Sequence, residues 1–153
     1  MEIERKFLVR MLPEGLERHP CKHIEQAYLC LEPALRVRRA GEDYFLTCKG
    51  KGLMEREEFE MPLSEEAYRH LFAKADGVRI VKDRYYLPCG AYTIELDRFA
   101  PPLAPLILAE VEFPTREEAL AFQPPEWFGR EVTGDPAYTS TCGGRLWRYC
   151  DLL

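Results

Sequence analysis

Charged side chains recur at every second position along several segments of the chain. Glu2 and Glu4 precede Lys6 in this way, and Arg36 and Arg38 have the same spacing. Two carboxylates at positions i and i+2 of a strand lie about 7 Å apart, and at an effective dielectric constant of about 20 they repel by about 2 kcal/mol. Selection for stability alone would alternate positive and negative charges along a face. The separation of acidic from basic residues therefore indicates that each group binds a ligand of opposite charge. Clustered carboxylates bind hard divalent cations, and clustered lysines and arginines bind phosphate oxygens.

The same spacing of charges extends over most of the chain. The further positions are Lys49, Arg56, Glu58, Glu60, Lys82, Arg84, Glu95, Asp97, Glu110 and Glu112. On any single strand such a pattern is typical of a polar face that is simply solvated. The interior of a barrel, however, would gather all of these acids and bases around one site.

Period-two alternation of polar and apolar residues marks the segments that carry these charges, and it is typical of strands with two different faces. In the first segment Glu2, Glu4 and Lys6 face one way, while Ile3 and Phe7 face the other. The alternation predicts eight strands, at residues 2–10, 22–31, 35–40, 43–49, 54–62, 78–87, 92–98 and 106–113.

Helix signals lie between and after these strands. Ser64 is the expected N-cap of a helix over 64–75, and Thr115 begins a second helix. Asp135-Pro136 predicts the start of a third, which Gly143-Gly144 would end. Adjacent strands with few helices predict a mainly β (α+β) fold, an eight-stranded antiparallel β-barrel with peripheral helices.

Length and charge narrow the functional classes. A chain of 153 residues favours one domain, over 1–153, with one sizeable core. A net charge of −5 argues against a nucleic-acid partner, and no apolar run approaches the ~20 residues that span a bilayer. The charged start lacks the apolar region of a signal peptide. We therefore expect a cytoplasmic protein without nucleic-acid or membrane partners, and a homodimer is left open.

Cysteines, histidines and tryptophans carry no clear chemical signal. None of the six cysteines forms a C-x-x-C pair, so zinc or redox motifs have little support, and we expect reduced structural thiols. The histidines His19, His23 and His70 have no ligand spacing and are expected at the surface. Trp127 and Trp147 are expected to cover the outer face of the barrel.

The charged segments resemble the signatures of the CYTH superfamily, also called the triphosphate tunnel metalloenzymes. Glu2-Ile3-Glu4-Arg5-Lys6 is similar to the E-x-E-x-K motif at the N-terminus of that family. Further similar segments follow in order at 26–29, 36–39, 47–50, 56–60, 82–84, 94–97, 110–112 and 131–136. The resemblance implies an eight-stranded antiparallel tunnel that holds a triphosphate chain with Mg²⁺ or Mn²⁺. It also implies an apolar outer face covered by helices, the inverse of an ordinary soluble barrel.

Roles for individual residues follow from this resemblance. It implies that phosphate oxygens are bound by Lys6, Arg36, Arg38, Lys49, Arg56, Lys82 and Arg84. It implies metal ligation first by Glu2, Glu4, Glu110 and Glu112, then by Asp97, with Glu58, Glu60 and Glu95 holding ligands in place or binding a second metal. The expected catalytic residues are Glu2, Glu4, Lys6 and Tyr28. For Tyr28 a role as proton acceptor and a role in packing are equally open.

The resemblance favours one reaction among several. Short single-domain bacterial members imply metal-dependent hydrolysis of inorganic triphosphate to pyrophosphate and phosphate. The alternatives are a class IV adenylate cyclase, a thiamine triphosphatase and a non-catalytic polyphosphate-binding module. Because every motif carboxylate is present, we expect a catalyst, a triphosphatase.

Overall fold

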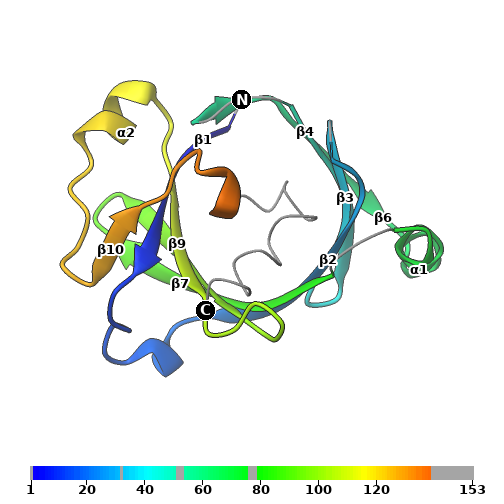
Figure 1. Ribbon diagram of the computed structural model, residues 1–153, viewed down its shortest axis with the longest axis horizontal. Helices are drawn as coiled ribbons and strands as arrows, with labels where there is room; N and C mark the ends of the chain where they lie inside the picture. Colours follow the sequence, from blue (N-terminus) through cyan, green and yellow to red (C-terminus); the bar gives the residue numbers. More distant parts are fainter. Residues whose placement is uncertain (1, 32, 51–53, 76–78, 139–153) are drawn as a thin grey trace.

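The computed structural model describes residues 2–31, 33–50, 54–75 and 79–138. Their ten strands form one antiparallel sheet in the order β10-β1-β9-β8-β7-β2-β3-β4-β6, with β5 paired to β1 beside this path. The strands are β1 (Glu2–Val9), β2 (Cys21–Leu31), β3 (Ala34–Ala40), β4 (Asp43–Lys49), β5 (Glu55–Arg56), β6 (Glu58–Leu63), β7 (Ile80–Cys89), β8 (Tyr92–Phe99), β9 (Ile107–Glu112) and β10 (Phe128–Glu131). Figure 1 shows the sheet curled into a ring.

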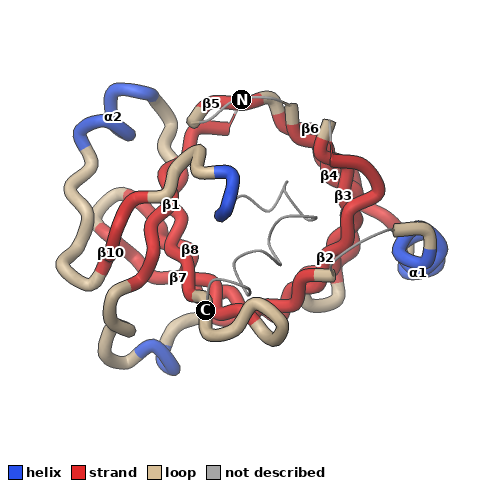
Figure 2. Tube along the Cα trace, viewed as in Figure 1, coloured by secondary structure: helices blue, strands red, loops and turns tan. Residues whose placement is uncertain are grey.

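The short strand β5 brings the two ends of the sheet together. β6 pairs with β4, whereas β5 pairs with β1 through Glu2 opposite Arg56 and Ile3 opposite Glu55. Only Glu57 separates β5 from β6. The predicted strand 54–62 is therefore split into two, and the predicted barrel-like tunnel is confirmed (Figure 2).

Two tight turns hold the registers of neighbouring strands. The β3–β4 turn begins at Gly41 with φ of 62°, and the β7–β8 turn begins at Gly90 with φ of 60°. Glycine adopts such positive φ values at no steric cost, and two-residue hairpins require them. A slip of one residue would turn every inward side chain outward, so these turns help to fix which charges face the interior.

Two α-helices lie outside the ring, as predicted (Figure 1). α1 (Glu65–Ala73) begins after Ser64, whose hydroxyl accepts a hydrogen bond from Ala67 N at 3.1 Å. α2 (Arg116–Ala121) begins after Thr115, which accepts from Glu118 N at 3.2 Å. These N-caps satisfy backbone donors that the first helical turn leaves without partners. No helix of the described residues is long and apolar enough to cross a membrane.

Two short 3₁₀ helices accompany them. η1 (Leu16–Arg18) was not predicted, because three residues carry no periodicity. η2 (Pro136–Tyr138) begins where the third helix was predicted. Unlike α1 and α2, it lies within the outline of the ring (Figure 2). The predicted end at Gly143-Gly144 lies outside the described residues.

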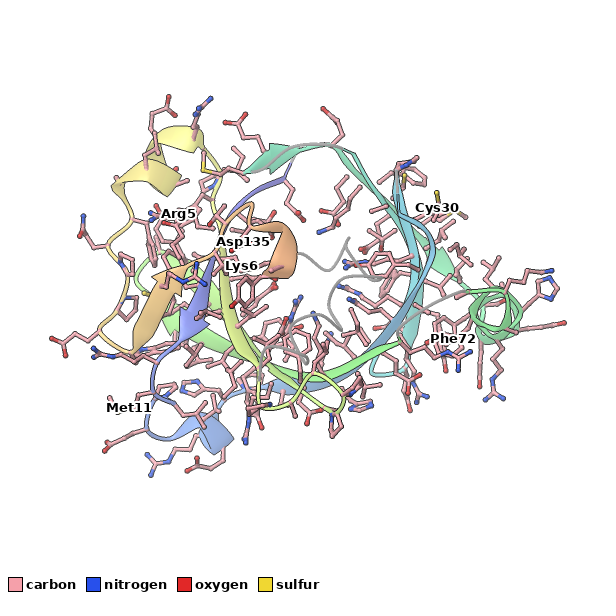
Figure 3. The ribbon with its side chains drawn as sticks, in the orientation of Figure 1. Arg5, Lys6, Met11, Cys30, Phe72 and Asp135 are labelled. Carbon is pink, nitrogen blue, oxygen red and sulfur yellow. The ribbon has the colours of Figure 1, made fainter. Side chains whose placement is uncertain are left out.

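The two largest apolar clusters lie on the outer face of the sheet. The larger cluster packs Phe7, Leu96 and Val111 of the strands against Phe122, and Trp127 packs on it as predicted. A second cluster lies under α1, where Phe72 is placed between the helix and the sheet (Figure 3). Trp147 lies outside the described residues. The helices therefore cover apolar side chains of the outer face. The inner face carries the charged side chains, together with a small apolar cluster around Tyr28.

Coverage of the outer face is not uniform. On β6, Phe59 and Met61 remain 61% and 41% exposed. Neither the α1 cluster nor the α2 cluster includes them. The cysteines Cys21, Cys48 and Cys89 are free thiols, and Cys142 and Cys150 lie outside the described residues. The helices therefore cover the strands next to them, including Leu63 of β6, and leave Phe59 and Met61 accessible.

We expect Leu96→Ala to lower the free energy of unfolding by about 2–5 kcal/mol, because Leu96 is 0% exposed within the larger cluster and its truncation leaves a cavity. Urea denaturation measures this loss. Leu120→Ala is the matched control, because Leu120 is 69% exposed on α2 and its loss should cost less than about 0.5 kcal/mol. Equal stability losses in both variants would contradict a core on the outer face.

Candidate active site

A cavity inside the ring is lined by charged side chains. It encloses about 590 Å³ of atom-free space, part of which is open to solvent. Every described residue that lines it is a glutamate, a lysine or an arginine, and these are Glu2, Glu4, Lys6, Arg36, Arg38, Lys49, Glu58, Glu60, Lys82, Arg84, Glu95, Glu110 and Glu112. All of them belong to the predicted site. The structure therefore brings together, on one inner surface, charged side chains that the period-two pattern assigned to the inner faces of separate strands.

Asp97 belongs to the predicted metal ligands but does not line the cavity. It is 0% exposed, and Arg84 donates to its two carboxylate oxygens at 2.7 and 2.8 Å. Lys82 Nζ lies 2.8 Å from the second oxygen. Burial opposes its ionisation, but Lys82 and Arg84 together keep the pKa of Asp97 below its usual value. In this structure Asp97 therefore positions two cavity cations and does not face the cavity as a ligand.

We expect Asp97→Asn to lower the free energy of unfolding by about 3–5 kcal/mol, because it leaves two buried cations without their shared carboxylate. Burial already lowers the pKa of Lys82 to about 8, so the variant should also lose the charge of Lys82 near neutral pH. Denaturant titration at pH 7 measures the stability. Asp83→Asn, at a half-exposed position on the same sheet, is the control, and equal effects of the two variants would contradict this role.

Tyr28 is likewise absent from the cavity lining. It is 3% exposed and packs in a small cluster with Ala34, Ile80 and Leu103. Its hydroxyl is buried and has no hydrogen-bond partner among the described residues. Of the two roles that the sequence left open, this structure favours packing. For Arg56, only the backbone pairing with Glu2 can be described.

Most cavity cations are neutralised by a carboxylate. Lys49 Nζ donates to Glu2 Oε1 at 2.9 Å, and Lys6 Nζ lies 3.5 Å from Glu110 Oε1. Arg84, besides its contacts with Asp97, lies 2.7 Å from Glu95 Oε2. Such buried pairs are stable only while both partners are present.

Arg36 and Arg38 stand apart from this pattern. Among the described residues, neither has a carboxylate within the 4 Å of a salt bridge, and neither Nε has a hydrogen-bond partner. Burial, and then the charges of Arg36 and Arg84, lower the pKa of Arg38. Two partly buried guanidinium groups without a counter-charge form a site that an anion would stabilise.

Carboxylates crowd the opposite wall of the cavity. Glu4 lies directly across from Glu112 on β1 and β9, and Glu95 lies across from Glu110 on β8 and β9. Burial, and then Glu110, raise the pKa of Glu4 to about 7. Burial and a hydrogen bond with Glu2 raise that of Glu58 to about 7. Like charges placed directly opposite destabilise a sheet, so this wall favours a bound cation.

The chemistry of this wall fits a hard divalent cation. Its side-chain donors are carboxylate oxygens, the ligands that Mg²⁺ and Mn²⁺ prefer. No group of three acidic, histidine or cysteine side chains within the described residues is already arranged to hold a metal by itself. Mg²⁺ usually takes only one or two carboxylates and completes its shell with water and substrate phosphates. The cavity therefore fits a metal that arrives with a phosphate ligand.

A match to a known family model decides the relationship of this chain. The model of the CYTH domain matches residues 1–131. This chain belongs to the CYTH family. The match includes all thirteen cavity-lining residues named above and every strand of the ring.

Relatives of this CYTH protein extend the likeness along most of the chain. It is 44% identical to an inorganic triphosphatase of Nitrosomonas europaea over 90% of this chain and 92% of that protein. It is 34% identical to an inorganic triphosphatase of Acetivibrio thermocellus, over 92% of this chain and 90% of that one. The crystal structure of the inorganic triphosphatase NE1496 superposes with a TM-score of 0.69 at 38% identity, covering 92% of each chain.

The residues just after the CYTH match hold Lys6 in place. Lys6 N donates to the hydroxyl of Thr133 at 2.9 Å, and Val132 N donates to Lys6 O at 2.8 Å. Lys6 Nζ donates to the carbonyl of Tyr138 in η2 at 3.3 Å, so Lys6 faces η2 while Arg5 faces α2 and β10 (Figure 3). The charge pattern could not indicate these contacts, because Thr133 and Val132 are neutral.

Proposed function

We propose that this CYTH protein hydrolyses inorganic triphosphate to pyrophosphate and phosphate with a divalent cation. The observation that carries the proposal is the division of the cavity. Arg36 and Arg38, which have no counter-charge among the described residues, lie on β3, and crowded glutamates lie on β1 and β9. A compact polyanion with a bound metal complements both walls at once. The names of two relatives as inorganic triphosphatases support the same reaction.

The side chains of this protein would act mainly by alignment and charge. Arg36 and Arg38 would bind phosphate oxygens, each with a planar fork of N–H donors. Lys6, Lys49, Lys82, Arg84 and Arg56 complete the proposed phosphate-binding set. Phosphoryl transfer depends on positioning and on stabilising charge at the transferred group, so no protein nucleophile is needed.

Mg²⁺ or Mn²⁺ would be held by glutamates of the opposite wall. Glu2, Glu4, Glu110 and Glu112 are the first proposed ligands, and Glu58, Glu60 and Glu95 would support them or bind a second ion. When bound, a divalent cation neutralises phosphate charge and lowers the pKa of coordinated water. Before binding, Lys6 and Lys49 compensate Glu110 and Glu2. With these carboxylates coordinated to a metal, the two lysines would be available to bind phosphate oxygens.

The test is an incubation of the purified protein with tripolyphosphate, ATP or thiamine triphosphate, each with Mg²⁺ or Mn²⁺, and quantification of every product. We expect the fastest phosphate release from tripolyphosphate, and none with EDTA. Cyclic AMP and pyrophosphate from ATP would indicate a cyclase. Metal-dependent binding of tripolyphosphate without any product would indicate a binding module. Either result would overturn the proposal.

A further inference from the structure

Buried polar atoms without partners gather on the two strands that flank β3. Gln26 on β2 is 1% exposed and Thr47 on β4 is 0% exposed. Within the described part of the chain, neither the amide nitrogen nor the amide oxygen of Gln26 has a hydrogen-bond partner, and the hydroxyl of Thr47 has none either. Buried polar groups in folded proteins are nearly always paired, so such a group of exceptions calls for a cause.

The strand register places each of these side chains beside a cavity arginine. Gln26 lies directly opposite Arg38, and Thr47 lies directly opposite Arg36. Directly opposite residues of an antiparallel sheet project from the same face, with Cβ atoms about 4.5–5.5 Å apart. In both pairs the arginine Nε is a buried donor without a partner, and its neighbour holds an acceptor oxygen without a partner. The two pairs thus repeat the same complementary and unmade hydrogen bond.

Neither Gln26 nor Thr47 lines the cavity, whereas Arg36 and Arg38 do. Among the described residues, the arginines therefore face the cavity, and the two neutral side chains lie beside them without lining it. On their other sides Gln26 lies opposite the apolar Ile80, and Thr47 lies opposite the carboxylate of Glu60. The arginines are therefore the cationic donors beside both residues, and Arg36 also lies opposite Tyr28. In the ligand-free protein the guanidinium of Arg38 lies instead over the ring of Phe45, 5.9 Å from its centre.

We propose that Gln26 and Thr47 are positioning residues, which accept hydrogen bonds from Nε of Arg38 and Arg36 when a triphosphate chain binds. The inference rests on the proposed function in so far as it takes the arginines as phosphate ligands. A guanidinium has five N–H donors in a fixed plane. When Nε–H donates a hydrogen bond to the protein, the two terminal nitrogens of the guanidinium group are left to donate to phosphate oxygens. Burying these polar groups without hydrogen bonds costs free energy of folding. The hydrogen bonds that form in the complex would remove this cost, so both residues favour binding.

The test compares substitutions that keep or remove the acceptor oxygen. Thr47→Val and Gln26→Met remove it at nearly constant size, while Thr47→Ser keeps it. We expect about tenfold weaker binding of tripolyphosphate in the first two variants, by calorimetry in EDTA where no turnover occurs, and near-normal binding in Thr47→Ser. The melting temperature should not fall, because each removed group is unpaired in the free protein. Thr93→Val, at an exposed threonine, is the matched control and should bind normally.

A double-mutant cycle separates positioning from general disturbance. Lysine has no Nε–H donor, so Thr47→Val should have little further effect in an Arg36→Lys background but its full effect in an Arg38→Lys background. Gln26→Met should show the opposite dependence. Unchanged binding in both single variants, or equal losses in both backgrounds, would overturn the inference while tripolyphosphate hydrolysis by the parent protein still stands. Lack of hydrolysis by the parent would instead count against the proposed function.

Discussion

Arg38→Ala is expected to lower kcat/KM for tripolyphosphate about 10²- to 10³-fold, the usual effect of losing one charge-stabilising donor in an active site. The reason is that Arg38 and its neighbour Arg36 are the described cavity cations without a carboxylate in salt-bridge range. The other cations must first leave a partner such as Glu2 or Glu110. The preformed anion site therefore depends on β3 more than on any other strand.

The same substitution should not destabilise the ligand-free protein. Burial and two neighbouring arginines already disfavour the charged form of Arg38, as its lowered pKa indicates. Removing such a charge is expected to leave the melting temperature unchanged or to raise it. Arg98→Ala, at an exposed position on β8, is the control and should retain full activity. Parental kcat/KM in Arg38→Ala would contradict an arginine-based anion site.

The inner face of the tunnel could be predicted because strands have a strict period of two. Once Glu4 was assigned to one face, Glu2 and Lys6 had to share it, and the same parity holds on β3 and β9. The interior is unusual because the polar face points inward, and only the combination of like-charged pairs on many strands indicated this. The local spacing of charged residues was thus enough to predict most residues of the candidate site.

Features that depend on distant pairing could not be predicted in this way. β10 has four residues, Phe-Gly-Arg-Glu, without alternation, and it forms only because Phe7 and Val9 of β1 offer it an edge. The break at Glu57 lies in a run of four charged residues, 55–58, across which the even-numbered charges continue at Arg56, Glu58 and Glu60. It arises because one segment pairs first with β1, through β5, and then with β4, through β6.

The sequence could also not predict which inward-facing side chains line the cavity and which are enclosed by their neighbours. Parity assigns Asp97 and Tyr28 to the inner face, but it does not say which neighbours meet them there. Lys82 and Arg84 enclose Asp97, and an apolar cluster encloses Tyr28. Both residues are therefore inside the barrel and away from the cavity surface.

Glu4→Gln is expected to abolish most activity and at the same time to stabilise the ligand-free protein above pH 7. The loss of one carboxylate metal ligand should reduce turnover by about 100-fold or more, since the loss of a residue that only orients a metal ligand already costs about 10–100-fold. The stabilising effect comes from the crowded wall. Glu4 lies across from Glu112, and burial and Glu110 raise its pKa from 4.5 to about 7.

The direction of the pH dependence follows from proton binding. Between pH 4.5 and about 7, the folded protein holds a proton on Glu4 that the unfolded chain has released. The unfolding free energy therefore falls as the pH rises through this interval, and the loss is complete above about pH 7. Glutamine does not ionise, so Glu4→Gln removes this loss. A smaller slope should remain, because Glu58 also has a pKa of about 7.

Melting temperatures measured in EDTA between pH 4.5 and 8.5 test this expectation. The Glu4→Gln curve should lie above that of the parent at pH 8 and approach it near pH 4.5, where Glu4 is protonated in the folded parent. Glu42→Gln, at an exposed turn position, is the control and should follow the parent at every pH. A Glu4→Gln protein that is inactive and less stable than the parent at pH 8 would contradict this expectation. It would mean that Glu4 stabilises the fold and that the crowded carboxylates do not need a bound cation.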